Sequence, residues 1–329
     1  MFKSILANEM ISFLELRKAT VKPRAIASEI TVLTLLDNHL TKHCYAEKSL
    51  SEEILDAWIL TLSGKSKTKA AKITTIRNFV KYLNGMGNNS FLPDMPKVKS
   101  DYIPYIYSDE ELVSIFHYAD NLEIKSSKAC SPYLPLKIPM ILRILYGCGT
   151  RLGETMVLQR KDLDFKANTI LLRETKSEKE RLIPVHESLM NILERYCLVL
   201  RIMCSPDAYL FPGKHREHPY TTRQVLSWFE DILKHTNIDQ REKEPHERGA
   251  CLHCFRHVFV LKSMRQMETL GHPIDLNDLL LPTYLGHECM LDTDRYMRFS
   301  GAQIPESLNA FEAFTAGLIP KTEAPYEEE

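Results

Sequence analysis

Six polar side chains of types that often act in catalysis lie between positions 151 and 296 of this chain. They are two arginines, one lysine, two histidines and one tyrosine, in the order Arg151, Lys176, His253, Arg256, His287 and Tyr296. Two guanidinium groups can bind phosphate oxygens bidentately and oppose the negative charge that develops when phosphorus is attacked. A tyrosine hydroxyl can attack phosphorus and hold it covalently, and a lysine or histidine can protonate the leaving oxygen. The set therefore predicts chemistry at a phosphodiester.

Each of these residues also fits a structural role when it is taken alone. Arg151 and Glu154 are three residues apart, which is the spacing of an ion pair on a helix surface. Lys176 lies within the charged sequence TKSEKE, which is typical of a solvated turn. His253 and Arg256 would share one helix face, which also fits a core histidine beside an exposed arginine. Only the complete set favours catalysis.

The sequence CLHCFRH offers four residues of types that bind zinc, namely Cys251, His253, Cys254 and His257. A structural zinc site needs a second ligand pair at a set distance, and neither CxxC nor HxxxH follows. We therefore expect no metal and no other cofactor. The eight cysteines show no disulfide framework, so we expect reduced thiols.

Four short sequences that contain the set resemble the motifs of the tyrosine recombinase family, which includes the phage integrases. They are LYGCGTRLGE, TKSEKERLIPV, LHCFRH and YLGHECMLDTDRYM, which follow one another in the family's order. At the level of these motifs the resemblance extends over about residues 107–300. The resemblance implies that Arg151 and Arg256 clamp the scissile phosphate. It also implies that Tyr296 is the nucleophile, which forms a 3′-phosphotyrosyl link, and that Lys176 is the general acid for the 5′-oxygen.

The same resemblance implies supporting roles for three further residues. His253 assists proton transfer, and His287 donates a hydrogen bond to the phosphate. Glu154 is a structural or assembly acid beside the first arginine.

The activity that the resemblance implies is site-specific DNA recombination, in which the phosphotyrosyl link conserves the bond energy, so neither a metal nor ATP is required. The segment between Arg256 and Gly286 is longer than in compact members, and its sequence LPTYLGH resembles integrases of mobile elements. This favours the integration, excision or transposition of a mobile element. Three alternatives stay open: type IB topoisomerase-like relaxation of DNA, a non-catalytic DNA-binding relative that assists a recombinase, and a metal-binding interaction module built on Cys251 and Cys254. The motifs encode neither the target sequence nor the direction of the reaction.

The elements that must position these residues begin with four amphipathic helices and no strand over residues 1–90. Ser51, followed by two acids, is a typical helix start, and the glycines at 85 and 87 are a typical helix stop. We expect residues 1–91 to form a SAM-like helical domain that binds the DNA core site. The proline-containing segment 92–106 would be a linker.

The fourth predicted helix and its entry carry a cluster of basic side chains, which are Lys65, Lys67, Lys69, Lys72 and Arg77. They fit either phosphate contacts or an ordinary solvated face. The net charge of the whole chain is −1, but residues 1–106 hold 15 Lys and Arg against 10 Asp and Glu. A local basic surface matters more for DNA binding than the total charge, so the composition leaves DNA binding open.

The rest of the chain predicts a mostly α-helical domain with a small antiparallel sheet. Ser108, followed by acids, should start its first helix, and TILLRE and RLIPV should pair as a hairpin. We assign residues 107–318 to this catalytic domain and residues 319–329 to an acidic tail. A last amphipathic helix, with Leu308, Phe311, Phe314 and Leu318 on one face, fits either packing on its own domain or docking into a neighbouring subunit.

The chain shows no sign of a membrane segment, because no apolar run approaches the roughly 18 residues that a span needs. Its first 20 residues are typical of an amphipathic helix rather than a signal peptide. We therefore expect a cytoplasmic protein of the prokaryotic nucleoid. By the resemblance, its partners are double-stranded DNA core sites, further copies of the chain up to a tetramer, and accessory proteins.

Overall fold

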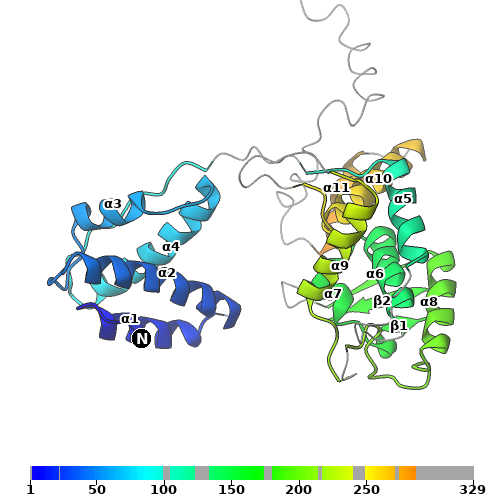
Figure 1. Cartoon of the computed structure of the whole chain (residues 1–329), viewed down its shortest axis with the longest axis horizontal. Helices are drawn as coiled ribbons and strands as arrows, with labels where there is room; N and C mark the ends of the chain where they lie inside the picture. Colours follow the sequence, from blue (N-terminus) through cyan, green and yellow to red (C-terminus); the bar gives the residue numbers. More distant parts are fainter. Residues whose placement is uncertain are drawn as a thin grey trace, which may run out of the picture. The chain divides into compact units, whose positions relative to one another are not determined.

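The computed structural model of the chain describes residues 2–21, 23–98, 104–122, 133–173, 180–213, 217–239, 249–270 and 274–286. The chain forms two compact units, Met1–Tyr102 and Ile103–Glu329, each with its own hydrophobic core (Figure 1). The boundary falls inside the segment 92–106 that the sequence marks as a linker. Among the described residues, no helix combines the length and the apolar character that crossing a membrane requires.

The first unit is a group of four helices, and its described residues contain no strand, as predicted. Its helices are α1 (Ala7–Lys18), α2 (Pro23–Lys42), α3 (Glu52–Leu60) and α4 (Ser66–Gly85). The side chain of Ser51 caps α3 by accepting a hydrogen bond from the backbone N–H of Ile54. Leu36, Trp58 and Phe79 are fully buried between the helices.

The first unit continues past its last helix. The backbone N–H of Phe91 donates to the carbonyl of Leu50 (2.8 Å), and Arg77 of α4 donates to the carbonyl of Pro93. Residues 91–93 are therefore part of the packing of this unit.

The second unit is mostly helical and contains one small sheet. Its helices are α5 (Asp109–Asp120), α6 (Leu134–Cys148), α7 (Leu152–Met156), α8 (Glu187–Val199), α9 (Thr222–His235), α10 (Cys254–Thr269) and α11 (Ile274–Leu285), with the short 3₁₀ helix η1 (Arg160–Asp162). Ser108 and Glu111 form the capping box that starts α5, which confirms the predicted start.

The sheet is antiparallel with the strand order β1 (Leu163–Asp164), β2 (Thr169–Leu172) and β3 (Arg181–Pro184). Ile170 pairs with Ile183 in the predicted hairpin, and both side chains are buried. The third strand, β1, is an addition that the sequence did not predict, because two residues are too few to show an alternating pattern.

Helix α6 lies in the centre of the second unit, where it packs against α5, α8 and α10 (Figure 1). Its residues Ile138, Ile141 and Leu145 are buried, in keeping with a helix that is apolar on most sides. It ends where Gly149 adopts the left-handed conformation (φ 57°). A Cβ atom at this position would lie 2.4 Å from the ring of Phe259 in α10, so only glycine fits the turn. This turn presents the first predicted arginine.

Candidate active site

Arg151 occupies the position just before α7, two residues after the left-handed Gly149. Its backbone N–H and its guanidinium group both donate to the carboxylate of Glu154, at 2.9 Å each. The side chain keeps an exposed fraction of 28%, whereas that of Glu154 is 3% exposed. Glu154 is therefore buried and holds Arg151 in place, while the guanidinium group of Arg151 still reaches the surface.

Arg256 lies in the first turn of α10 and is only 1% exposed. One terminal nitrogen donates to the carbonyl of Gly149 (2.6 Å) and the other to the carbonyl of Leu285 (2.8 Å). One interpretation of the sequence was an exposed arginine at this position, but Arg256 is buried. Arg256 links the turn before Arg151 to the last carbonyl of α11.

Two histidines lie near Arg256, one just before α10 and one within it. His253 is exposed directly before the helix, and its ring lies 5.3 Å from that of buried His257, nearly perpendicular to it. Burial, together with the positive charge available on His253 and Arg256, lowers the pKa of His257 to about 3. His253 is the accessible histidine of the pair and keeps its place as the candidate for proton transfer.

Helix α11 ends beside Arg256, and the glycine of the Gly-His motif follows it. Its last residue is Leu285, and Gly286 is in the left-handed conformation (φ 67°). Lys176, His287 and Tyr296 lie outside the described residues, as do the last predicted helix and the acidic tail. The described part of the site therefore consists of Arg151, His253, Arg256 and the glycine that precedes His287.

Arg181, the first residue of β3, belongs to this site although the sequence did not single it out. It donates to both carboxylate oxygens of Glu154 (2.8 and 3.2 Å) and to the carbonyl of Tyr284 (3.0 Å). Burial on its own would raise the pKa of Glu154, but hydrogen bonds and charge from Arg181 and Arg151 lower it. The signal in the sequence is weak, because an arginine opening a strand is usually a surface residue.

The basic cluster of the first unit divides into two groups. Lys65 and Lys67 are exposed at the start of α4, while Lys69 and Lys72 are half-buried along it. Arg77 already donates to the carbonyl of Pro93. The two exposed lysines are thus the members best placed for a phosphate.

The cysteines beside His253 form a close pair, since the sulfur atoms of Cys251 and Cys254 are 3.5 Å apart. Within the part of the chain that the structure describes, no group of three or more His, Cys, Asp and Glu side chains is arranged to hold a metal ion.

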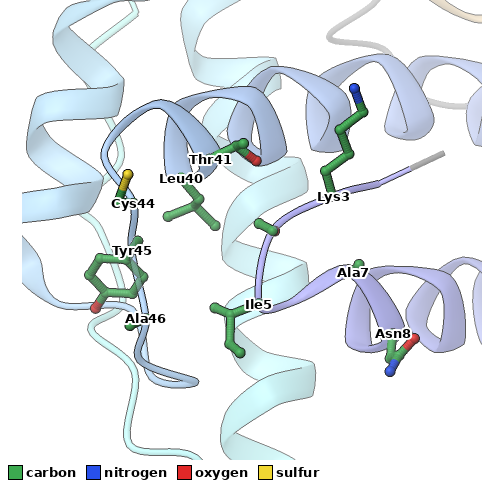
Figure 2. Close-up of a pocket in the computed structure, with 10 residues that line it drawn as sticks. Lys3, Ile5, Ala7, Asn8, Leu40, Thr41, Cys44, Tyr45 and Ala46 are labelled. Carbon is green, nitrogen blue, oxygen red and sulfur yellow. The ribbon is translucent and has the colours of Figure 1, made fainter.

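A hollow of about 550 Å³ lies in the first unit, between the start of α1 and the end of α2 (Figure 2). Lys3, Asn8, Thr41, Cys44 and Tyr45 are among the residues that line it. It contains none of the residues that the sequence selected.

Comparisons with known proteins agree on one family. The sequence model of the phage integrase family matches residues 107–299. An integrase/recombinase of Sinorhizobium fredii is 27% identical over 256 residues, which are 73% of this chain and 75% of that protein. Tyrosine recombinase XerC of Staphylococcus aureus is 27% identical over 247 residues, 73% of each chain.

Solved structures show the same fold. A XerH site-specific recombinase bound to its difH substrate superposes with a TM-score of 0.67 at 18% identity, covering 88% of this chain and 80% of that one. The Tn1549 transposon integrase in complex with a circular intermediate DNA gives a TM-score of 0.64 at 16% identity, covering 95% of this chain and 100% of that one.

Proposed function

The chain belongs to the phage integrase family of tyrosine recombinases, which supports site-specific DNA recombination, and we propose that it cuts and rejoins DNA through a phosphotyrosyl intermediate. The observation that carries the proposal is the pair of hydrogen bonds that Arg256 donates to the carbonyls of Gly149 and Leu285. It joins the turn before Arg151 to the end of α11, one residue before the Gly286-His287 motif.

In the proposed reaction the hydroxyl oxygen of Tyr296 attacks the scissile phosphorus, its proton passes to His253, and the bond to the 5′-oxygen breaks. Lys176 gives its proton to that leaving oxygen, and the phosphorus stays attached to Tyr296 through a 3′-phosphotyrosyl ester. A phenol has a pKa of about 10, so forming the phenolate at neutral pH costs about 4 kcal/mol. Neighbouring cationic side chains reduce this cost. A 5′-hydroxyl of the partner strand then attacks the ester and releases Tyr296.

Arg151 and Arg256 are assigned to the non-bridging phosphate oxygens, with His253 assisting proton transfer and His287 donating a hydrogen bond. The exposed fraction of Arg151 and the exposure of His253 support the assignments of these two residues. Arg256 is buried and bonded to two backbone carbonyls, so its assignment, like that of His287, rests on its place in the motif. Each step exchanges one phosphate ester for another, so we expect it to need neither ATP nor a metal.

The biological role that we propose is the integration, excision or transposition of a mobile element. The Tn1549 transposon integrase shares the fold over 95% of this chain (TM-score 0.64), which fits this role. Within the proposal, residues 1–91 bind the DNA core site and residues 107–318 carry the chemistry. A lambda integrase tetramer bound to a Holliday junction has a similar fold (TM-score 0.62, 13% identity), in keeping with an assembly of four protomers.

A covalent-capture experiment tests the proposal. Wild type, Tyr296→Phe and Tyr284→Phe are incubated with fragmented DNA from the source cell, then denatured, and the DNA linked to protein is sequenced. Tyr284 is the matched control, because it stands twelve residues before Tyr296 in the sequence and Tyr284→Phe also removes one phenol oxygen, which lies 3.4 Å from the carbonyl of Pro184. We expect one enriched locus with wild type and Tyr284→Phe and none with Tyr296→Phe.

The outcomes separate the proposal from its alternatives. Capture by Tyr296→Phe would contradict the assignment of the nucleophile. If no variant captures DNA although wild type binds it, the protein is the non-catalytic relative. Capture and relaxation of plasmid DNA without exchange between two sites would favour the topoisomerase-like alternative.

A further inference from the structure

Arg181 makes three contacts that tie separate segments of the second unit together. Its two terminal nitrogens bind both oxygens of Glu154, at 3.2 and 2.8 Å, and its Nε binds the carbonyl of Tyr284 at 3.0 Å. Glu154 is 27 residues away in the sequence and Tyr284 is 103 residues away. The Arg181 side chain is 12% exposed, so it is held within the domain and not at its surface.

The same guanidinium group packs against the Gly-His motif. A Cβ atom on Gly286 would lie 2.8 Å from a terminal nitrogen of Arg181 and 3.1 Å from its central carbon. The left-handed conformation of Gly286 (φ 67°) already favours glycine, and a Cβ atom there would have to displace the guanidinium group of Arg181. Arg181 thus supports the turn that leads into His287.

Glu154 connects Arg181 to Arg151, because its carboxylate accepts hydrogen bonds from both. Its carboxylate is 3% exposed and accepts hydrogen bonds from Arg181, from the guanidinium group of Arg151 and from the Arg151 backbone. Arg181 binds this carboxylate bidentately, and Arg151 binds it once through its guanidinium group and once through its backbone, so the carboxylate holds both arginines in place.

We propose that Arg181 is a positioning residue that fixes Arg151 of the phosphate clamp through Glu154 and fixes the turn at Gly286 through the Tyr284 carbonyl. It does not touch the phosphate. It holds Arg151 and the turn at Gly286 in fixed positions relative to each other. The inference rests on the proposed function, because it assigns a task within that reaction.

The test compares Arg181→Ala and Arg181→Lys with Arg151→Ala and with the control Arg143→Ala. Arg143 forms a bidentate pair with Asp120 (2.8 Å for both bonds) at another place in the second unit. Single-turnover cleavage is measured on a duplex that carries the site recovered by covalent capture. The scissile group is either the natural phosphate or a methylphosphonate, in which a neutral methyl group replaces one charged oxygen.

The methylphosphonate distinguishes positioning from folding. On the natural phosphate we expect Arg181→Ala to lower the cleavage rate by about 100-fold, the usual cost of misplacing a catalytic group by about 1 Å. A neutral phosphorus group needs the arginine clamp less, so both Arg181→Ala and Arg151→Ala should lose several-fold less on the methylphosphonate. The double variant should lose no more than Arg151→Ala loses alone, and Arg143→Ala should cleave both substrates like wild type.

Arg181→Lys covers the case in which Arg181→Ala does not fold. The lysine keeps a positive charge beside Glu154 but cannot bind Glu154 and the Tyr284 carbonyl with the same planar group. It should fold, by circular dichroism, and show the same dependence on the substrate with a smaller loss. Amide hydrogen exchange in the peptide over 280–286 should be faster in both Arg181 variants and unchanged in Arg143→Ala.

Three results would overturn the inference, as would equal cleavage rates of wild type and Arg181→Ala. One is equal loss on the two substrates, another is a double variant whose losses multiply, and the third is an Arg181→Lys variant that cleaves like wild type. If wild type itself forms no adduct, the proposed function fails and this inference fails with it. Cleavage by wild type and by Arg181→Ala at the same rate removes only the inference.

Discussion

His257 is the one buried histidine beside Arg256 on α10, and its ionisation sets a dependence of stability on pH. Its pKa in the folded chain is about 3, below the usual 6.5, mainly because burial disfavours the charged ring. Between these two values the unfolded chain binds a proton at this residue and the folded chain does not. Above pH 6.5 the ring is neutral in both states, and the free energy of unfolding is highest with respect to this residue. It falls as the pH drops from 6.5 toward 3, because the unfolded chain gains a proton that the folded chain does not.

We expect the free energy of unfolding of the second unit to fall by about 1 kcal/mol from His257 alone between pH 7.5 and 5.5. In His257→Gln this part of the drop should be absent. Urea titrations at the two pH values measure it in a Trp58→Phe background, where Trp228 is the only tryptophan left and reports on the second unit.

His117→Gln is the control for this experiment, because His117 is exposed on α5. It should show the same drop as the parent. If His257→Gln loses as much stability as the parent between the two pH values, the residue is charged in the folded chain and the assignment is wrong.

The turn between α6 and α7 is the element that places Arg151, and Gly149 is its critical residue. Gly149→Ala should destabilise the second unit by about 2 kcal/mol or more, because alanine is strained at φ 57° and its Cβ would lie 2.4 Å from the ring of Phe259. Gly153→Ala, four residues on, should be neutral or slightly stabilising, because a Cβ there meets nothing within 4 Å and alanine favours the helix. Urea unfolding of the two variants checks the difference.

The double variant Gly149→Ala/Phe259→Leu separates the two causes. Removing the ring should recover the part of the loss that comes from the clash and leave the part that comes from backbone strain. Equal stabilities of Gly149→Ala and Gly153→Ala would contradict this account of the turn.

The elements that were predictable from the sequence are those with local signals. Ser51 and Ser108 mark helix starts, because each side chain accepts a hydrogen bond from the backbone only three residues further on. Gly149 likewise marks the end of α6. Strand β1 was missed because it is held by its pairing with β2 and has no pattern of its own. Helix α11 was missed because Pro282 within it argues for a break.

The candidate site follows the same division. Its motifs were recognisable because each box is short and contiguous. The link from Arg181 to Glu154 and Tyr284 was not, because it spans 27 and 103 residues and exists only once the sheet and α11 have formed. For the same reason, the sequence left open an exposed Arg256, whereas the carbonyls of Gly149 and Leu285 enclose it.

At the scale of the whole molecule, the excess of positive charge and the proposed catalytic residues lie in different units. Residues 1–106 carry an excess of positive charge, with 15 Lys and Arg against 10 Asp and Glu, and the remaining residues carry 27 against 33. The buried cores of the two units share no residue. A chain with a net charge of −1 therefore concentrates its attraction for a polyanion in the unit that contains none of the proposed catalytic residues.

This division predicts which lysines set the salt dependence of DNA binding. Lys65 and Lys67 are exposed at the start of α4, and no acidic partner is recorded for either among the described residues. Lys18 and Lys48 are also exposed but pair with Glu15 (2.6 Å) and Glu9 (3.0 Å). Each lysine that contacts a phosphate adds about 0.9 to the slope of log affinity against log salt. In Lys65→Gln/Lys67→Gln the slope should therefore be less steep by up to about 1.8.

The slope is measured by fluorescence anisotropy of a labelled duplex over a range of KCl concentrations. The double variant Lys18→Gln/Lys48→Gln removes the same formal charge from the same unit, but from lysines that carboxylates already neutralise, so its slope should match that of wild type. The comparison separates contact from net charge. If the two double variants change the slope equally, only the total charge of the unit matters. If neither changes it, the phosphates are bound elsewhere in the chain, and the first unit must recognise DNA by other means.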